Sequence, residues 1–296
     1  MFTASIMLQL TIDGITRGAM YGLMAAGLAL IFGIVRVINM AHGELFMLGA
    51  YVMYFVTVAF GLPAPIGILV ASATLFFVGV TLERSLIAPL RARLGDRWLV
   101  DGYVLTIGIM VILQNLALIA FGPRERGLAS LWPGRMEFGD LVIANERLVI
   151  LAGAIAAMTA LGLFLGRTAL GRAIRATAEN PEAAQVMGID TDRIYALTFG
   201  IGAALAGAVG ALLLSIYPAY PTVGGDILLK AFVVVILGGL GRVGGAMLAG
   251  PLLGIIESYA TAFAPGGWQS TIISALVLAV LVVRPQGLFS RQVTRP

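Results

Sequence analysis

The chain has no cysteine, a single histidine and a single lysine, and only 11% of its residues are charged. A disulfide needs two thiols, and a structural zinc site needs four nitrogen or sulfur ligands, so the composition excludes both. The only lysine, Lys230, follows Leu229, whereas a phosphate-binding loop places lysine directly after glycine. Nucleotide hydrolysis, if it drives this chain, therefore belongs to a partner.

What the chain does have is hydrophobic residues, which make up 59% of its 296 positions against about 45–50% in an ordinary soluble domain. A helix needs about 20 residues to cross a bilayer, so nine crossings use about 180 residues. The arginines lie between apolar runs and form no basic face for nucleic acid. The composition predicts an all-α polytopic membrane protein of about 8–10 helices, some of them broken or re-entrant, in one transmembrane domain over residues 1–296.

Charges, prolines and glycines divide the apolar sequence into nine expected spans. They are residues 14–35, 43–60, 64–84, 99–121, 147–166, 195–217, 227–241, 243–264 and 268–283. Residues 1–12 lack a basic leader and a cleavage site, so we interpret them as the lead into the first span. The run 227–241 is short for a full crossing, which suggests a re-entrant or broken helix.

The positive charges indicate how the chain is oriented. With an outside N-terminus and alternating spans, thirteen of the nineteen basic residues fall inside: Arg36, Arg84, Arg91, Arg93, Arg97, Arg167, Arg172, Arg175, Arg193, Arg242, Arg284, Arg291 and Arg295. The positive-inside rule therefore favours an outside N-terminus and a cytoplasmic C-terminus. It also makes the loop 122–146 external and the loop 167–193 cytoplasmic. The external loop is either a lid or docking surface or a simple connector.

The cytoplasmic loop contains the signals of a short helix. Asn180 is a good N-cap, Pro181 suits the first helical position, and Glu182 favours the positive end of the helix dipole. Gly188 can adopt the left-handed conformation that ends a helix, and residue 190 or 191 can cap the next span. This predicts a folded knob below the membrane, with a small apolar surface suited to a protein partner.

These residues resemble those of a known family. Glu182-Ala183-Ala184-x-x-x-Gly188 resembles the Glu-Ala-Ala loop of ABC-importer permeases, whose short cytoplasmic helix docks on the ATP-binding subunit. The wider loop from Gly171 to Arg193 is similar to LivH-type permeases for branched-chain amino acids. So are Asn39-Met40-Ala41-His42-Gly43-Glu44 and Leu237-Gly238-Gly239-Leu240-Gly241.

The resemblance implies a non-catalytic permease subunit in a bacterial plasma membrane. Its implied partners are a second homologous permease, two ATP-binding subunits that hold ATP and magnesium, and a soluble substrate-binding protein. The residues that it assigns to coupling are Glu182, Ala183, Ala184, Met187 and Gly188. The alternative is a cytoplasmic cap that links two spans and contacts lipid headgroups through Arg172 and Arg175.

Two segments are candidates for the substrate path. Asn39, His42, Gly43 and Glu44 place polar groups between two apolar runs, as in a broken helix whose backbone ends contact substrate. Glu44 would attract the ammonium group of an amino acid. The alternative is a hairpin whose polar groups cap the next helix in water. The second segment holds Gly238, Gly239 and Gly241, which form either an interrupted helix or a tight turn between close-packed helices.

Other residues within the spans are assigned to packing. Gly202, Ala206 and Gly210, and also Ala246, Gly250 and Gly254, recur every four residues and allow helix backbones to approach closely. Gln114 and Asn115 hydrogen-bond between helices or line a pore. Glu257 is a candidate partner for Arg17 or Lys230.

The sequence leaves the passenger open. The first hypothesis is an importer permease for branched-chain or other hydrophobic amino acids, with urea, short amides or sugars as alternatives. The second is a secondary transporter or channel driven by an ion gradient, which needs titratable or carbonyl-rich sites near the midplane. A membrane enzyme is the poorest alternative, because one histidine and no evident carboxylate pair leave little for general acid–base chemistry.

Overall fold

The computed structural model describes residues 4–94, 98–128, 130–138, 141–264, 268–284 and 286–289. The helices are α1 (Ala4–Val35), α2 (His42–Val58), α3 (Ala64–Leu82), the π-helix η1 (Glu83–Ile87), α4 (Ala88–Leu94), α5 (Trp98–Phe121), α6 (Asn145–Arg167), α7 (Ala169–Glu179), α8 (Pro181–Val186), α9 (Thr191–Leu213), α10 (Val223–Gly238), α11 (Val243–Phe263) and α12 (Trp268–Val283). The strands are β1 (Arg135–Phe138) and β2 (Leu141–Ala144), which pair antiparallel.

Each of the nine predicted spans corresponds to a helix. By length and composition, six helical segments of the described residues can cross a membrane, and α2 is among the shorter apolar helices. Three predicted spans had wrong boundaries. The span predicted at 195–217 is the helix Thr191–Leu213. The third segment continues through η1 and α4 to Leu94, and the run predicted at 227–241 is the helix Val223–Gly238. Positive φ angles at Gly239 and Gly241, 98° and 76°, end α10 earlier than its apolar sequence suggested.

Helix α1 begins at Ala4, so residues 4–12 do lead into the first span. Asp13 lies within this helix, and its carboxylate forms an ion pair with Arg147 of α6. Pairing of this kind lowers the cost of a charge at the edge of the membrane. Of the arginines used for the orientation, Arg97, Arg291 and Arg295 lie outside the described residues.

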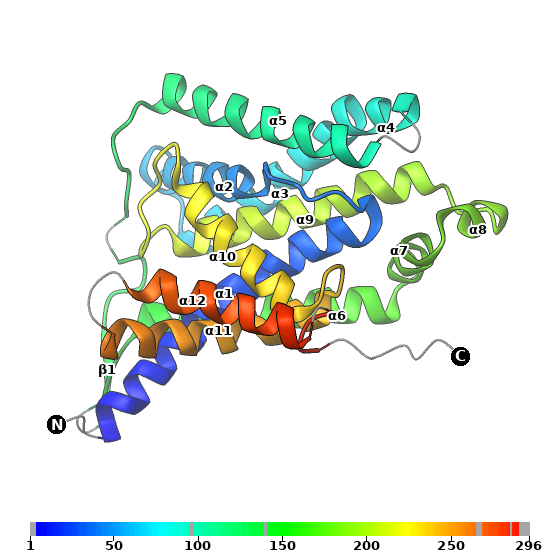
Figure 1. Cartoon of the computed structure of the whole chain (residues 1–296). Helices are drawn as coiled ribbons and strands as arrows, with labels where there is room; N and C mark the ends of the chain where they lie inside the picture. Colours follow the sequence, from blue (N-terminus) through cyan, green and yellow to red (C-terminus); the bar gives the residue numbers. More distant parts are fainter. Residues whose placement is uncertain are drawn as a thin grey trace.

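The small-residue stripes bring helix backbones into contact, as predicted. A Cβ atom added to Gly254 of α11 would lie 2.1 Å from the carbonyl oxygen of Gly14 in α1. One added to Gly210 of α9 would lie 2.1 Å from the carbonyl oxygen of Phe46 in α2. Figure 1 shows α1 running through the bundle between α11 and α9. Close packing of this kind gains dispersion energy where lipid and side chains are equally apolar.

The two ends of the bundle differ. At one end lie the first turns of α1 and the hairpin β1–β2, with α4, α7 and α8 at the other (Figure 1). The loop after α5 is tied to the loop before α10 by paired backbone hydrogen bonds between Arg126 and Ala219. The short hairpin within residues 122–146 is the one sheet among the described residues, so the all-α class holds for the rest of the described chain.

Candidate functional site

The chain between α1 and α2 turns back into the bundle. Helix α1 ends at Val35, Arg36 has a φ of 57°, and α2 begins only at His42. The Trp98 indole donates a hydrogen bond to the Val35 carbonyl at 3.3 Å, and the Met40 amide donates to the Thr106 hydroxyl at 3.2 Å. In Figure 1 the blue trace after α1 runs back beneath α5 to the start of α2.

The residues of α5 that are hydrogen-bonded to this segment and to the start of α2 show how deep the chain reaches into the bundle. Trp98, Thr106 and Gln114 are spaced eight residues apart, or about 12 Å along a helix, and Gln114 donates to Glu44 at 2.9 Å. The start of α2 therefore lies beside the middle of α5. It also lies beside the middle of α1, because the His42 ring nitrogen is 3.3 Å from the Met24 carbonyl oxygen. The predicted interruption between the two apolar runs is present, and it reaches the depth of the helix midpoints.

The four candidate residues of the interrupted segment lie together and are buried; they are Asn39, His42, Gly43 and Glu44. Asn39 accepts a hydrogen bond from the Ala41 amide at 3.1 Å. A Cβ atom on Gly43 would lie 2.4 Å from the Gly224 carbonyl oxygen, so α2 and α10 touch at their first turns. Glu44 has an exposed fraction of 0%, and its second carboxylate oxygen has no hydrogen-bond partner among the described residues.

The glycine segment lies elsewhere. A Cβ atom on Gly238 would lie 2.5 Å from the Ala246 nitrogen, and one on Gly33 would lie 3.3 Å from the Gly241 oxygen. The segment is thus a tight turn between α10 and α11 that packs on the last residues of α1. Gly224 and Gly238 are fourteen residues apart on α10, or about 21 Å. The structure does not bring Gly238, Gly239 and Gly241 to the Asn39–Glu44 segment.

Two neighbouring cavities open beside the start of α10. One, of about 300 Å³, is lined by Gln114 and Asn115, and the other, of about 690 Å³, by Asp226 and Lys230. Glu125 and Tyr220, which are outside the membrane-spanning helices, line both. Burial raises the pKa of the Tyr220 hydroxyl, and the carboxylates of Asp226 and Glu125 raise it further. Gln114 is thus both the hydrogen-bond donor to Glu44 and part of a cavity wall.

The loop between α6 and α9 folds as the local sequence predicted. The Asn180 side chain accepts a hydrogen bond from the Ala183 amide at 3.0 Å, and Pro181 occupies the first turn of α8. Gly188 has a φ of 83°, and Asp190 caps α9 by accepting from the Arg193 amide at 3.0 Å. These caps satisfy backbone groups at both helix ends, which makes a six-residue helix a defined structure.

The candidate coupling residues divide into exposed and buried positions. Met187 is 81% exposed and its neighbour Val186 is 88% exposed, and Glu182, Ala183 and Gly188 are exposed as well. Ala184 is only 3% exposed, because it faces the rest of the chain. A partner can therefore touch four of the five predicted residues directly, while Ala184 anchors α8.

Comparison with known proteins agrees with this architecture. The family described as "Branched-chain amino acid transport system / permease component" matches residues 10–281. The chain belongs to this family. The high-affinity branched-chain amino acid transport system permease protein BraD of Pseudomonas aeruginosa is 34% identical over 299 residues, covering 96% of each chain. LivH of Escherichia coli K12 is 35% identical over 298 residues, again covering 96% of each.

A more distant relative is the probable branched-chain amino acid transport permease protein LivH of Methanocaldococcus jannaschii. It is 27% identical over 279 residues, covering 90% of this chain and 87% of its own. No solved structure matches the chain significantly. The matches and the apolar helices identify this permease as a multi-pass protein of the bacterial inner membrane.

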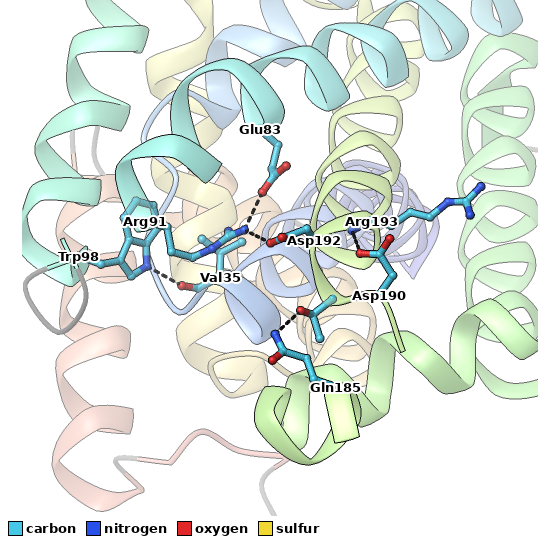
Figure 2. A network of polar contacts seen from close by, with 9 residues as sticks. Val35, Glu83, Arg91, Trp98, Gln185, Asp190, Asp192 and Arg193 are labelled. Carbon is cyan, nitrogen blue, oxygen red and sulfur yellow. Dashed lines mark hydrogen bonds and ion pairs between the residues drawn. The ribbon is translucent and has the colours of Figure 1, made fainter. Parts of the chain in front are cut away.

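In this permease, polar contacts connect α8 to α9, and α9 to α4 and η1. Figure 2 shows Gln185 of α8 bonded to the start of α9, where its amide donates to the Thr191 hydroxyl at 2.7 Å. At the same helix end, Asp192 lies 3.3 Å from Arg91 of α4, which lies 3.2 Å from Glu83 of η1. The Arg91 guanidinium also stacks on the Tyr195 ring at 3.8 Å. These contacts place α8, the start of α9 and the π-helical turn after α3 in one continuous set of neighbours.

Some residues of the site were missed by sequence reasoning. Asp226 and Tyr220 line the cavities, and Arg91 links α4 to α9. For Asp226 a signal existed, because it lies four residues before Lys230 on an otherwise apolar helix, which places both charges on one face. For Arg91 the sequence offered no signal, because its partner Asp192 is 101 residues away in the chain. Tyr220 lies before α10, six residues from Asp226, so no helical periodicity relates the two.

Proposed function

We propose that this chain is the permease subunit of an ATP-driven importer of branched-chain or other hydrophobic amino acids. The observation that carries the proposal is the match to branched-chain amino acid permeases over nearly the whole chain, including the loop that contains α8. The composition is consistent with it, since a largely apolar path with few charges suits a zwitterion with an apolar side chain.

The proposed complex contains a second, related permease, two ATP-binding subunits and a soluble substrate-binding protein. ATP and magnesium are bound by the ATP-binding subunits, and this chain performs no catalysis. Residues 1–296 form one transmembrane domain with an outside N-terminus and a cytoplasmic C-terminus, as the distribution of arginines favours. The hairpin β1–β2 and the two neighbouring cavities then face the outside, and α8 faces the cytoplasm.

Coupling is proposed to run through α8. Glu182, Ala183, Met187 and Gly188 meet the ATP-binding subunit, and Ala184 holds α8 to its own chain. A rigid helix seated in a partner moves with it, and two rigid bodies that share a contact transmit a domain motion. The contacts from Gln185 through Thr191 and Asp192 to Arg91 give that motion a route to α3 and α9.

The substrate path is proposed to pass the interrupted segment. Asn39, His42, Gly43 and Glu44 lie at the depth of the helix midpoints, and Gln114 separates Glu44 from a cavity. Gly238, Gly239 and Gly241 form the turn between α10 and α11 that packs on the end of α1, at the proposed cytoplasmic end. Half-helix ends of this kind contact substrates and ions in other transporters.

The function is tested by reconstitution in liposomes. The complete complex is expected to accumulate leucine only when ATP and the binding protein are both present. The permease chain alone, given a Na⁺ or H⁺ gradient, is expected to accumulate none. Leucine uptake by the isolated chain on an ion gradient would replace the proposal with a secondary transporter. Uptake of urea or a sugar in preference to leucine would keep the class and change the passenger.

Replacing Glu44 by glutamine tests the path. The variant keeps the size of the side chain and a hydrogen bond to Gln114, but it removes the negative charge that attracts an ammonium group. We expect the KM for leucine uptake to rise about tenfold, equal to about 1.4 kcal/mol, with basal ATP hydrolysis unchanged. An unaltered KM would assign Glu44 to helix packing.

A further inference from the structure

One face of α10 carries charges where a lipid-facing helix has none. Asp226 and Lys230 are four residues apart, and Leu229 between them is 64% exposed. Residues at this spacing share one face of a helix. Because a charged face toward hydrocarbon is costly, charges in a membrane helix face a water-filled space or a protein partner. This face of α10 therefore does not lie against lipid.

Lys230 lies at the depth of the bundle's middle. Its ammonium group is 3.0 Å from the hydroxyl of Tyr21, which is buried about halfway along α1. The same ammonium is 2.6 Å from the carboxylate of Glu257 on α11, which is 2% exposed. The pairing of Glu257 with Lys230, one of two alternatives left open by the sequence, is confirmed. The Lys230 side chain remains 26% exposed, and its exposed part lines the larger cavity.

That cavity is lined by acidic, cationic and apolar side chains. Its volume of about 690 Å³ falls within the range of small-molecule sites. Asp226, Glu125 and Tyr220 give it an acidic end, and the Tyr220 hydroxyl lies 3.4 Å from the Asp226 carboxylate. Lys230 gives it a cationic point one helical turn away, and Val233 and Ile273 add apolar wall.

We propose that this cavity is a binding site for a free zwitterionic amino acid on its way through the permease. The α-ammonium group meets Asp226, the α-carboxylate meets Lys230, and the apolar side chain packs on Val233 and Ile273. This assignment rests on the proposed function. The spacing fits, because side chains four residues apart on a helix have Cβ atoms about 5–6 Å from each other, so two charges borne on one carbon atom can bridge them.

The buried Glu257 has a defined part in this site. It fixes the Lys230 ammonium in one position and balances its charge while the site is empty, which lowers the cost of a cation at this depth. Tyr21 adds a second contact from α1, so Lys230 is positioned by two other helices. A pre-positioned cation loses little conformational freedom when a carboxylate arrives. Glu257 and Tyr21 are positioning residues and do not touch the ligand.

The test measures binding of tritiated leucine to the detergent-purified transporter without the binding protein, so that the permease alone sets the specificity. Competitors are leucinamide, which keeps the ammonium and lacks the carboxylate, and 4-methylpentanoate, which keeps the carboxylate and lacks the ammonium. Both are expected to compete at least tenfold more weakly than leucine. Absence of leucine binding at millimolar concentration would overturn the proposal.

Two variants assign the ends of the ligand. Asp226→Asn is expected to weaken leucine binding at least tenfold and to leave the inhibition constant of 4-methylpentanoate unchanged. The double variant Lys230→Met/Glu257→Gln removes the ion pair as a unit, so no buried charge is left unpaired. It is expected to weaken leucine binding at least tenfold and to leave the inhibition constant of leucinamide unchanged. Asp101→Asn on α5, an exposed acid outside the cavity, is the charge-matched control and should bind as the unaltered protein does.

The outcomes separate this site from the proposed function. Unchanged leucine affinity in Asp226→Asn, or equal effects of each variant on both competitors, would overturn the site while ATP-driven uptake by the unaltered complex still supported the importer. If the double variant does not accumulate, Asp226→Asn decides alone, because Asp226 is exposed and its hydrogen bond is to the peripheral Tyr220 hydroxyl.

Discussion

Valine at position 188 is expected to reduce ATP-driven uptake at least tenfold while the chain still inserts and accumulates normally. Gly188 has a φ of 83°, and a β-branched residue in this region costs on the order of 1–3 kcal/mol. The Gly188 amide donates to the Gln185 carbonyl at 2.9 Å, and the Ile189 amide donates to the Ala184 carbonyl at 3.0 Å. Both bonds belong to the Schellman turn that ends α8, so valine distorts the helix at its exposed end.

The readout is the ratio of leucine transported to ATP hydrolysed in liposomes. Uncoupling lowers this ratio, whereas a folding defect lowers the yield of complex. Gly188→Asn is the matched control, because asparagine tolerates the left-handed conformation better than other non-glycine residues, and it should retain most of the activity. No heavy atom lies within 4 Å of a Cβ at this position, so a defect in the valine variant reflects backbone conformation and not a clash. Normal coupling with valine would contradict the role given to α8.

Valine at position 254 is expected to prevent the permease from accumulating in folded form. A Cβ atom there would lie 2.1 Å from the Gly14 carbonyl oxygen and 2.5 Å from the Gly18 Cα atom. Both are backbone atoms, so no flexible side chain can move aside, and α1 must separate from α11. Overpacking typically costs about 1–3 kcal/mol even where side chains can adjust, and here the cost includes the loss of the closest contact between two central helices.

The measurement is the amount of monodisperse protein after mild detergent extraction, and its midpoint of thermal unfolding. Gly162→Val on α6 is the matched control, since a Cβ atom there meets nothing within 4 Å; it should leave both values near those of the unaltered chain. A Gly254→Val protein as abundant and as heat-stable as the control would show that the close packing of α1 and α11 is not required.

The sequence predicted those features that depend on neighbouring residues. Apolar runs located the nine helices, the residues Asn180, Pro181 and Gly188 located α8 and its caps, and the repeat of Gly250 and Gly254 located a close helix contact. Each of these follows from local backbone preference or from a periodicity of four residues. Such signals are present in a short window of sequence, whatever the rest of the fold does.

The path of residues 36–41 could not be predicted in the same way. Its course is set by Trp98 and Thr106, which are more than sixty residues distant in the chain, and no local pattern identifies such partners. The burial of Ala184 could not be predicted from local sequence either, because it depends on which face of α8 packs against the rest of the chain. The cavity beside α10 requires Glu125, Tyr220 and Lys230 to converge from three separate segments.

The central claim is that separate ATP-binding subunits move this permease through α8, and one thiol can test it. Because the chain contains no cysteine, Met187→Cys introduces a single reactive group at an 81% exposed position. In the assembled transporter, turning over ATP in liposomes, we predict that a short thiol cross-linker joins residue 187 to an ATP-binding subunit and stops uptake. A thiol that stays unlinked, and reacts with a water-soluble reagent as fast in the working complex as in the isolated chain, would contradict the account.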